Sequence, residues 1–340
     1  MGLELEQDSG SHGLTEENII HIPGLLSRWV RLANGAKAHY VTSGETGPAV
    51  ILLHGGIQGS SGTAGWRFMA PFLGAHGFRV FAPDQPAYGL SDNRPEFYPT
   101  KGYQSYVEYI DMLADALCLD KFHIGGNSFG THNVMEYVVN HPERVLSYAM
   151  IAAGSPPSLV DPALRVAPKD GKFTPNPNYV SPGWDGTEES MRILMEGIIY
   201  KPAAIWPELI TMRNYAGNLQ KESTAARMKA NQELAKDPNY EQWADLRQRL
   251  PKITIPGIYL YGKNDVLGPV ENGWNQEDVL PNVQFFYPDE CGHQGQTDQP
   301  EMFNQVFLEF FRDGKVSRKT ADWAGVSDRR AENPSLVEQA

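Results

Sequence analysis

The sequence predicts an α/β fold in which a mostly parallel, doubly wound sheet carries an inserted helical cap. Short, continuously apolar runs, typical of strands buried on both faces, alternate with longer runs of helical spacing. The strand-like runs cover residues 49–55, 79–84, 122–127, 146–154, 257–262 and 283–288, after an opening hairpin at 29–44. The helical patterns between them cover residues 66–77, 103–119, 131–145 and 302–314. This alternation favours a doubly wound sheet, because parallel neighbours need a helical crossover.

One interval, between residues 154 and 257, breaks the alternation. It opens with a proline-rich stretch and continues with helical patterns at residues 189–200, 204–217, 224–237 and 240–250. A helical block inserted between two strands is expected to form a lid over the sheet edge where open α/β sheets bind ligands. The expected organisation is a loosely held polar arm at 1–22, a core at 23–153 and 251–315, a cap at 154–250, and a polar, peripheral tail at 316–340.

Composition narrows the class of partner. The 340 residues are 41% hydrophobic and carry a formal net charge of −12, with no basic block. This balance disfavours nucleic acid and anionic membranes as partners and favours a small molecule, mainly apolar or aromatic. The start lacks the features of a signal peptide, no long apolar span occurs, and the only cysteines are Cys118 and Cys291, so we expect a cytoplasmic protein. Zinc and nucleotide-phosphate motifs do not occur in the sequence, so neither a metal nor another cofactor is expected.

The stretch GNSFG places Ser128 between a strand-like run and a helical one. This context is typical of a nucleophile elbow, in which a serine occupies a tight, strained turn. Gly126 and Gly130 would leave room for the close approach of strand and helix. The first amide of the helix, that of Phe129, would face a developing oxyanion. The sequence therefore predicts Ser128 as a nucleophile.

A serine nucleophile needs a general base within hydrogen-bond reach, and the chain has nine histidines. His293 lies in the loop between the last strand-like run and the last helical one, at the sheet edge expected for the elbow. His123 falls inside a strand and is expected to be a core residue. His132 lies one helical turn beyond Ser128, too far along the helix to face the hydroxyl. We therefore predict His293 as the base.

A carboxylate at the end of the preceding strand should orient the histidine and stabilise its imidazolium form. Asp265 occupies that position, and Glu271 and Asp289 are alternatives that we expect to be solvated. The order Ser128, Asp265, His293 along the chain is the one expected for this arrangement.

A second oxyanion donor is expected in the glycine-rich loop at residues 54–66. Gly55 and Gly56 let the backbone turn back toward the elbow, so the amide of Gly56 or of Ile57 would join that of Phe129. The alternative is a flexible Gly/Ser loop without a catalytic role.

Six segments between residues 28 and 313 together resemble the α/β-hydrolase superfamily and, within it, the meta-cleavage-product hydrolases, which split carbon–carbon bonds in ring-opened aromatic compounds. They are LLHGG (52–56), DQPAYGLSD (84–92), GGNSFG (125–130), HPERV (141–145), YGKNDVLGP (261–269) and CGHQGQTDQPEMFNQ (291–305). The resemblance implies that the insert is a cap whose Arg213 holds a substrate carboxylate, which suits a planar guanidinium. It also implies that Asn127, Gly55 and Gln294 line the substrate pocket and that the protein forms homo-oligomers.

Two features depart from that family. Gln294 stands where the family usually has tryptophan, and the loop at residues 54–66 is longer than usual. We therefore expect a cofactor-free serine hydrolase that cleaves an ester, with a lactone or a carboxylate-bearing aromatic monoester as further substrates. One alternative is carbon–carbon bond hydrolysis of a meta-cleavage product by the same residues. The other is a ligand receptor that keeps the fold without turnover.

Overall fold

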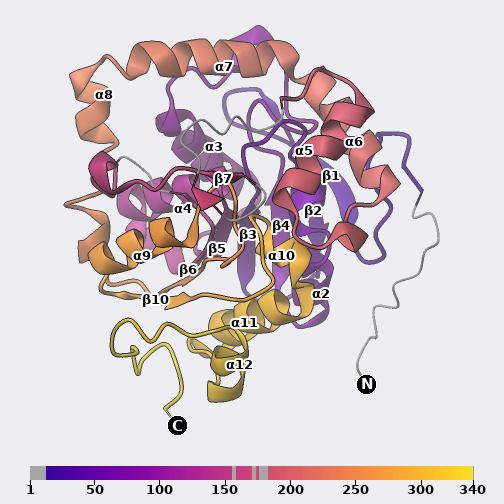
Figure 1. Cartoon of the computed structure of the whole chain (residues 1–340). Helices are drawn as coiled ribbons and strands as arrows, with labels where there is room; N and C mark the ends of the chain where they lie inside the picture. The colour runs from indigo at the N-terminus through magenta and orange to yellow at the C-terminus, as the bar shows by residue number, and fades with distance from the viewer. Residues whose placement is uncertain (1–12, 155–157, 171–173, 176–182, 340) are drawn as a thin grey trace.

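The computed structural model describes residues 13–154, 158–170, 174–175 and 183–339. Its centre is an eight-stranded sheet with the order β1-β2-β4-β3-β5-β6-β9-β10. The strands are β1 Leu26–Arg31, β2 Lys37–Ser43, β3 Ala49–Leu53, β4 Arg79–Pro83, β5 Phe122–Asn127, β6 Val145–Ile151, β9 Gly257–Leu260 and β10 Val283–Phe286. β2 pairs antiparallel with β1 and β4, and the other neighbours are parallel. The predicted sheet and its opening hairpin are confirmed (Figure 1).

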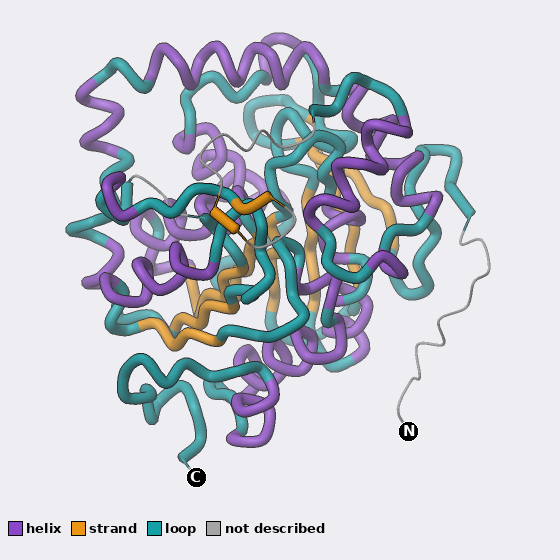
Figure 2. Tube along the Cα trace, viewed as in Figure 1, coloured by secondary structure: helices purple, strands orange, loops and turns teal. Residues whose placement is uncertain are grey.

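Helices cover both faces of the sheet (Figure 2). Side chains of one apolar cluster come from α3 Tyr103–Ala116, α4 Phe129–Asn140 and α9 Val270–Val279. Those of the other come from α1 Gly62–Trp66, α2 Met69–Ala75, α11 Pro300–Asp313 and α12 Arg318–Trp323. Every residue of the central strand β5 is buried, which explains why its sequence does not alternate between apolar and polar positions.

The insert between β6 and β9 is mainly helical. Besides three short 3-10 helices, its described residues form two short strands and four α-helices: β7 Lys169–Asp170, β8 Thr174–Pro175, α5 Glu188–Ile198, α6 Pro207–Leu219, α7 Lys221–Leu234 and α8 Pro238–Trp243. Figure 1 shows α7 and α8 at the opposite end of the molecule from α11 and α12. α5 and α6 bury a shared apolar face that includes Met191, Leu209 and Met212. Among the described residues, no helix is long and apolar enough to cross a membrane.

The N-terminal arm is held more firmly than its polar composition predicts. Its first part, residues 1–12, lies outside the described residues. Ile19, Ile20 and Ile22, however, are buried in the same apolar cluster as α5 and α6. The prediction of a loosely held arm is therefore wrong for residues 13–22, because a few isoleucines among polar neighbours form no periodic pattern.

The C-terminal residues are not peripheral either. Val316 and Val337 are buried and bridge to each other, while Val326 bridges to Phe286 of the edge strand β10. This contact covers part of an edge that would otherwise expose unpaired backbone groups. The prediction of a polar, peripheral tail at 316–340 is wrong in this respect, since isolated apolar residues in a polar stretch give no strand or helix signal.

Candidate active site

Ser128 stands in a strained turn between β5 and α4. Its backbone has φ 56° and ψ −118°, a region that residues other than glycine rarely adopt. A Cβ atom at position 130 would lie 2.1 Å from the carbonyl oxygen of Leu53, and one at position 126 would lie 2.5 Å from the carbonyl oxygen of Gly130. Glycine is therefore required at both positions for the turn that presents Ser128 at the end of the strand.

We expect Gly130→Ala to lower the free energy of unfolding by about 2 to 3 kcal/mol, because β3 or α4 must move to accept the methyl group. Gly197→Ala is the matched control, since its Cβ would meet nothing within 4 Å in the middle of the insert. Removing that helical glycine should stabilise the protein by about 0.5 to 1 kcal/mol. Urea unfolding followed by circular dichroism measures both changes. Equal stability of wild type and Gly130→Ala would contradict the close approach.

Three side chains from separate loops meet at the carboxyl edge of the sheet. Nε2 of His293 lies 2.8 Å from Oγ of Ser128, and its Nδ1 lies 2.7 Å from Oδ2 of Asp265. The other carboxylate oxygen of Asp265 accepts hydrogen bonds from the amides of Leu267 and Gly268, both at 2.9 Å. The structure thus brings together the serine, histidine and aspartate that the sequence predicts, with the aspartate fixed in place.

The competing groups lie elsewhere. Asp289 forms an exposed ion pair with Lys263, and Glu271 lies in α9. His123 contacts a serine hydroxyl on β6 in the core, and His132 contacts the backbone carbonyl of a residue just after β6. Asp289 is exposed and His123 lies in the core, as the sequence predicts, whereas Glu271 is half-buried rather than fully solvated.

The electrostatic setting of His293 suits a general base. Burial by itself lowers the pKa of the imidazole, but the charge of Asp265 and the hydrogen bond to it outweigh burial, and Asp298 adds to them, so the pKa of His293 is raised. In the neutral imidazole, Nδ1 donates its proton to Asp265 and Nε2 is free to accept the proton of Ser128. The arrangement can therefore convert the hydroxyl of Ser128 into a nucleophile.

The loop after β3 lies directly against the elbow. A Cβ atom at Gly55 would lie 3.4 Å from Cβ of Ser128, and one at Gly56 would lie 2.7 Å from Cβ of Phe129. Phe129 is the first residue of α4, so its amide has no acceptor within the helix. The loop and the helix terminus are therefore both close enough to Ser128 to supply amides to an oxyanion.

Two side chains not foreseen from the sequence fix the peptide groups of this loop. Nδ1 of His54 lies 2.7 Å from the carbonyl oxygen of Gly55, while its Nε2 accepts a backbone N–H. The hydroxyl of Tyr88 donates to the carbonyl of Gly56 at 2.9 Å. Burial lowers the pKa of His54 to about 4, so it is neutral at pH 7. Because N–H and C=O point in opposite directions in a trans peptide, the amides of Gly56 and Ile57 point away from these partners.

Arg213 of α6 is a buried cation within the insert. It is 2% exposed, its Nη2 lies 3.4 Å from Oγ of Ser60, and its Nε has no hydrogen-bond partner among the described residues. Burial lowers the pKa of Arg213 to about 10. Among the described residues Arg213 forms no ion pair. Because a buried cation without a counter-ion is costly, the site favours an anionic ligand.

A second buried arginine, Arg67, was not foreseen from the sequence. Its guanidinium donates to the carbonyl of Ala204 in the insert at 2.8 Å and lies over the rings of Phe68 and Trp206. Burial lowers the pKa of Arg67 to about 9, and the charge of Arg213 acts in the same direction. Arg67 thus joins the insert to the core and adds positive potential near Arg213.

The loop that carries His293 is tied to both the sheet and the insert. Asn127 donates to the carbonyl of His293 at 3.0 Å, so it orients this loop as well as lying beside Ser128. The amide of His293 donates to the carbonyl of Ile198 at the end of α5. Asp298, in α10 Gly295–Asp298, accepts amides from this loop and from the insert, and burial raises the pKa of Asp298 to about 6. Gln294 is buried directly after His293.

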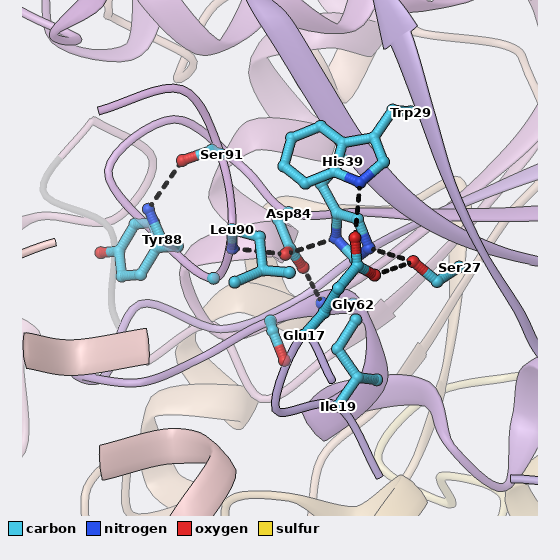
Figure 3. A network of polar contacts seen from close by, with 12 residues as sticks. Glu17, Ile19, Ser27, Trp29, His39, Gly62, Asp84, Tyr88, Leu90 and Ser91 are labelled. Atoms are coloured by element: carbon cyan, nitrogen blue, oxygen red, sulfur yellow. Dashed lines mark hydrogen bonds and ion pairs between the residues drawn. The ribbon is translucent and has the colours of Figure 1, made fainter. Parts of the chain in front are cut away.

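Figure 3 shows another serine, histidine and aspartate in line, on β1, on β2 and directly after β4. Nδ1 of His39 lies 2.7 Å from Asp84, and its Nε2 lies 3.0 Å from Oγ of Ser27. The hydroxyl of Ser27, however, donates its proton to Glu17 at 2.7 Å. Ser27 also lies inside β1, so it is not presented by a strand-to-helix turn as Ser128 is. We therefore interpret this network as structural, since it ties the N-terminal arm to the sheet.

Comparison with known proteins gives one family. Residues 48–300 match the family described as alpha/beta hydrolase fold. The chain is 27% identical over 309 residues to a 2-hydroxy-6-oxononadienedioate/2-hydroxy-6-oxononatrienedioate hydrolase from Paraburkholderia phymatum, covering 86% of this chain and 98% of that protein. It is 29% identical over 291 residues to a hydrolase of the same description from Pseudomonas putida, covering 84% and 96%.

Solved structures show the same fold. A meta-cleavage product hydrolase from Pseudomonas fluorescens IP01 has a TM-score of 0.64 and 24% identity, covering 85% of this chain and 98% of its own. The 2-hydroxy-6-oxo-6-phenylhexa-2,4-dienoate hydrolase from Rhodococcus sp. strain RHA1 reaches 0.65 at 24% identity, covering 85% and 99%. An epoxide hydrolase from Vigna radiata reaches 0.66 at 18% identity, covering 85% and 98%. Structural likeness at this level therefore shows the fold and does not separate reactions.

Proposed function

The chain belongs to the α/β-hydrolase family and is a hydrolase, and from this premise we propose that it cleaves a carbon–carbon bond in ring-fission products of aromatic compounds. The observation that carries the proposal is the pairing of His293 with Ser128 together with the burial of Arg213, which forms no ion pair among the described residues. The relatives aligned over 84% or more of the chain are named for 2-hydroxy-6-oxo acids. A carboxylate of such an acid would pair with Arg213.

The reaction follows from the geometry in two stages. His293 accepts the proton of Ser128, and Oγ attacks the keto carbon of the substrate to form a tetrahedral oxyanion. The amide of Phe129 and that of Gly56 or Ile57 would hold this oxyanion. Its collapse breaks the carbon–carbon bond, the electron pair passes to the leaving carbon, and His293 returns the proton. Water activated by His293 then hydrolyses the acyl-enzyme and releases a carboxylic acid.

The leaving carbon is the difficult part of this reaction, because it must accept an electron pair. In a 2-hydroxy-6-oxo dienoic acid, the proton of the 2-hydroxyl must first move to the carbon next to the keto group. In the resulting 2-oxo tautomer the leaving carbon is conjugated through a double bond with the 2-oxo group, so the pair is delocalised onto that oxygen, which lies beside the carboxylate. The positive charge of Arg213 would therefore stabilise the developing enolate as well as the bound substrate. Interactions that strengthen in the transition state raise kcat and not only affinity.

We expect Arg213→Met to lower kcat/KM for a 2-hydroxy-6-oxo acid by about 10²-fold, the value of one charged hydrogen-bonded contact. Arg213→Lys should recover part of this loss, because it keeps the charge without the planar fork. The decay of the coloured substrate, followed by absorbance, measures the rate. Arg312→Met, on the exposed face of α11, is the control. An equal rate for wild type and Arg213→Met would contradict the assignment of Arg213 to the carboxylate.

Ester hydrolysis is the second candidate. It was the first choice from the sequence, and one observation still favours it: Gln294, not tryptophan, follows His293. The relatives that span most of the chain favour carbon–carbon cleavage instead. A panel of aromatic esters and ring-fission acids separates the two. Rapid ester hydrolysis without bleaching of any ring-fission acid would replace the first candidate by the second.

A further inference from the structure

Arg227 joins the insert to the core beside the nucleophile. It lies on α7, and Cζ of its guanidinium lies 5.1 Å from the ring centre of Tyr88 and 5.7 Å from that of Phe129. Its Nε atom is buried and has no hydrogen-bond partner within the described part of the chain. The two rings are therefore contacts through which this cation meets the core. The proposed mechanism does not use it.

Tyr88, the first of the two aromatic residues, holds the loop that follows β3. It is buried, and its hydroxyl donates to the carbonyl oxygen of Gly56 at 2.9 Å. The carbonyl of Gly56 and the amide of Ile57 belong to the same planar peptide unit. A hydrogen bond that fixes this carbonyl therefore also fixes the direction of the Ile57 amide, which is one of the two candidate loop donors to the oxyanion.

Phe129, the second aromatic residue, supplies the helix donor to the same oxyanion. The ring centres of three tyrosines surround that of Phe129, at 6.1 Å for Tyr88, 5.9 Å for Tyr103 and 4.8 Å for Tyr106. The Cβ position of Gly56 would lie 2.7 Å from Cβ of Phe129. The loop and the start of α4 are therefore in contact, and a shift of the Phe129 ring would disturb both sources of amides.

We propose that Arg227 is a positioning residue for the oxyanion site, in which it keeps the loop and helix amides in place through the rings of Tyr88 and Phe129. The inference rests on the oxyanion site of the proposed function. A cation is attracted to the negative face of an aromatic ring, and more strongly where water is excluded. Donors held in place before the reaction need no reorganisation as charge develops. Loss of Arg227 should therefore slow the attack by Ser128 and leave ground-state binding unchanged.

The test measures the attack of Ser128 on a neutral phosphonate without a carboxylate, ethyl p-nitrophenyl hexylphosphonate. The bond between Oγ and phosphorus forms, the bond from phosphorus to p-nitrophenolate breaks, and His293 takes the serine proton. The phosphoryl oxygen develops its charge in the oxyanion site, so the limiting rate constant reports on the amide donors. The absorbance of p-nitrophenolate gives this rate constant and the half-saturating phosphonate concentration for each variant.

Arg227→Met should lower the limiting rate constant about tenfold, a smaller loss than the roughly 10²- to 10³-fold typical of removing a donor itself. The half-saturating concentration should change less than about twofold, because ground-state binding does not use the oxyanion site. Arg227→Lys should recover most of the rate, since an ammonium group can lie over the same rings. Lys229→Met, which removes an exposed cation from the same helix, is the matched control and should change neither quantity.

Tyr88→Phe tests the route through the loop, because it keeps the ring and removes the hydroxyl that holds Gly56. It should lower the limiting rate constant on its own. In the Tyr88→Phe background, Arg227→Met should cost only about threefold, since residues that act through one another are not additive. Circular dichroism checks that each variant is folded.

Three outcomes would overturn the proposal. The first is a limiting rate constant that stays unchanged in Arg227→Met or, whether or not that variant folds, in Tyr88→Phe. The second is an equal loss from Arg227→Met with and without the hydroxyl of Tyr88. The third is a loss that Arg227→Lys does not recover or that appears only in the half-saturating concentration, which indicates a packing role. Failure of the proposed function has a different signature, namely a wild type that reacts with the phosphonate but does not turn over ring-fission acids.

Discussion

Ser128→Ala should reduce kcat for the proposed substrate by about 10⁵- to 10⁶-fold, the loss typical of removing a serine nucleophile. The reason lies in the geometry: Oγ of Ser128 is 2.8 Å from Nε2 of His293, and among the described residues no other hydroxyl is hydrogen-bonded to that nitrogen. Folding should be unaffected, because Ser128 is half-buried and its φ of 56° is strained for serine and alanine alike. Absorbance decay of the substrate under single-turnover conditions measures the rate, and circular dichroism checks the fold.

Ser27→Ala is the matched control for this experiment. Ser27 also lies 3.0 Å from a histidine that contacts an aspartate, but its proton is given to Glu17. Its loss should change the rate by less than about twofold, as expected for a surface substitution away from the site. An organophosphonate should label Ser128 in wild type. A near-native rate for Ser128→Ala, or label on Ser27 instead, would refute the assignment, and an unlabelled wild type would favour a receptor without turnover.

The elements nearest the chemistry were the easiest to predict from the sequence. Ser128, Asp265 and His293 each follow a continuously apolar strand, and carboxyl ends of parallel strands meet at one sheet edge. Their proximity then follows from topology, without knowledge of any side-chain contact. Gly130 could also be predicted from the sequence as a residue of the tight turn. A helix that starts beside β3 leaves no room for a Cβ atom at that position.

Contacts between distant segments could not be predicted in this way. Arg67 is followed by an ordinary helix, and only the docking of the insert places its guanidinium against Ala204. His54 contacts the carbonyl oxygen of Gly55 in the loop at residues 54–66, and the available signal was its position directly before two glycines. The buried isoleucines of the arm have no period of their own. Their side chains are buried because α5 and α6 pack against them, a contact that no local sequence pattern indicates.

Arg213 separates the part of the molecule that the proposed function assigns to catalysis from the part that it assigns to selectivity. Ser128, His293 and Asp265 belong to the core, where the proposed chemistry would act on a carbonyl that reaches Ser128. The insert supplies Arg213 of α6, so under the proposed function it would select which acids bind. Selectivity should therefore change with substitutions in the insert that leave the contacts of His293 intact.

Asp265→Asn should lower kcat by about 10⁴-fold, since a neutral amide neither stabilises the imidazolium nor enforces the productive tautomer of His293. Asp289→Asn is the control, because that carboxylate is exposed and pairs with Lys263. The same substitution should also move the pH dependence. In wild type, Asp265 raises the pKa of His293 against the effect of burial, so the acid limb of kcat/KM should lie above the ordinary histidine value of about 6.5.

The direction in which the acid limb moves shows whether His293 or Asp298 is the group that titrates. The neutral imidazole is the active form, so activity is lost as the pH falls through the pKa of His293. Without the charge of Asp265, burial dominates and lowers that pKa, so the acid limb of Asp265→Asn should move to lower pH while the rate falls. Asp298, whose pKa burial raises to about 6, also titrates in this range. An acid limb that stays in place in Asp265→Asn but disappears in Asp298→Asn would assign the limb to Asp298 and contradict the role of His293 as the titrating base.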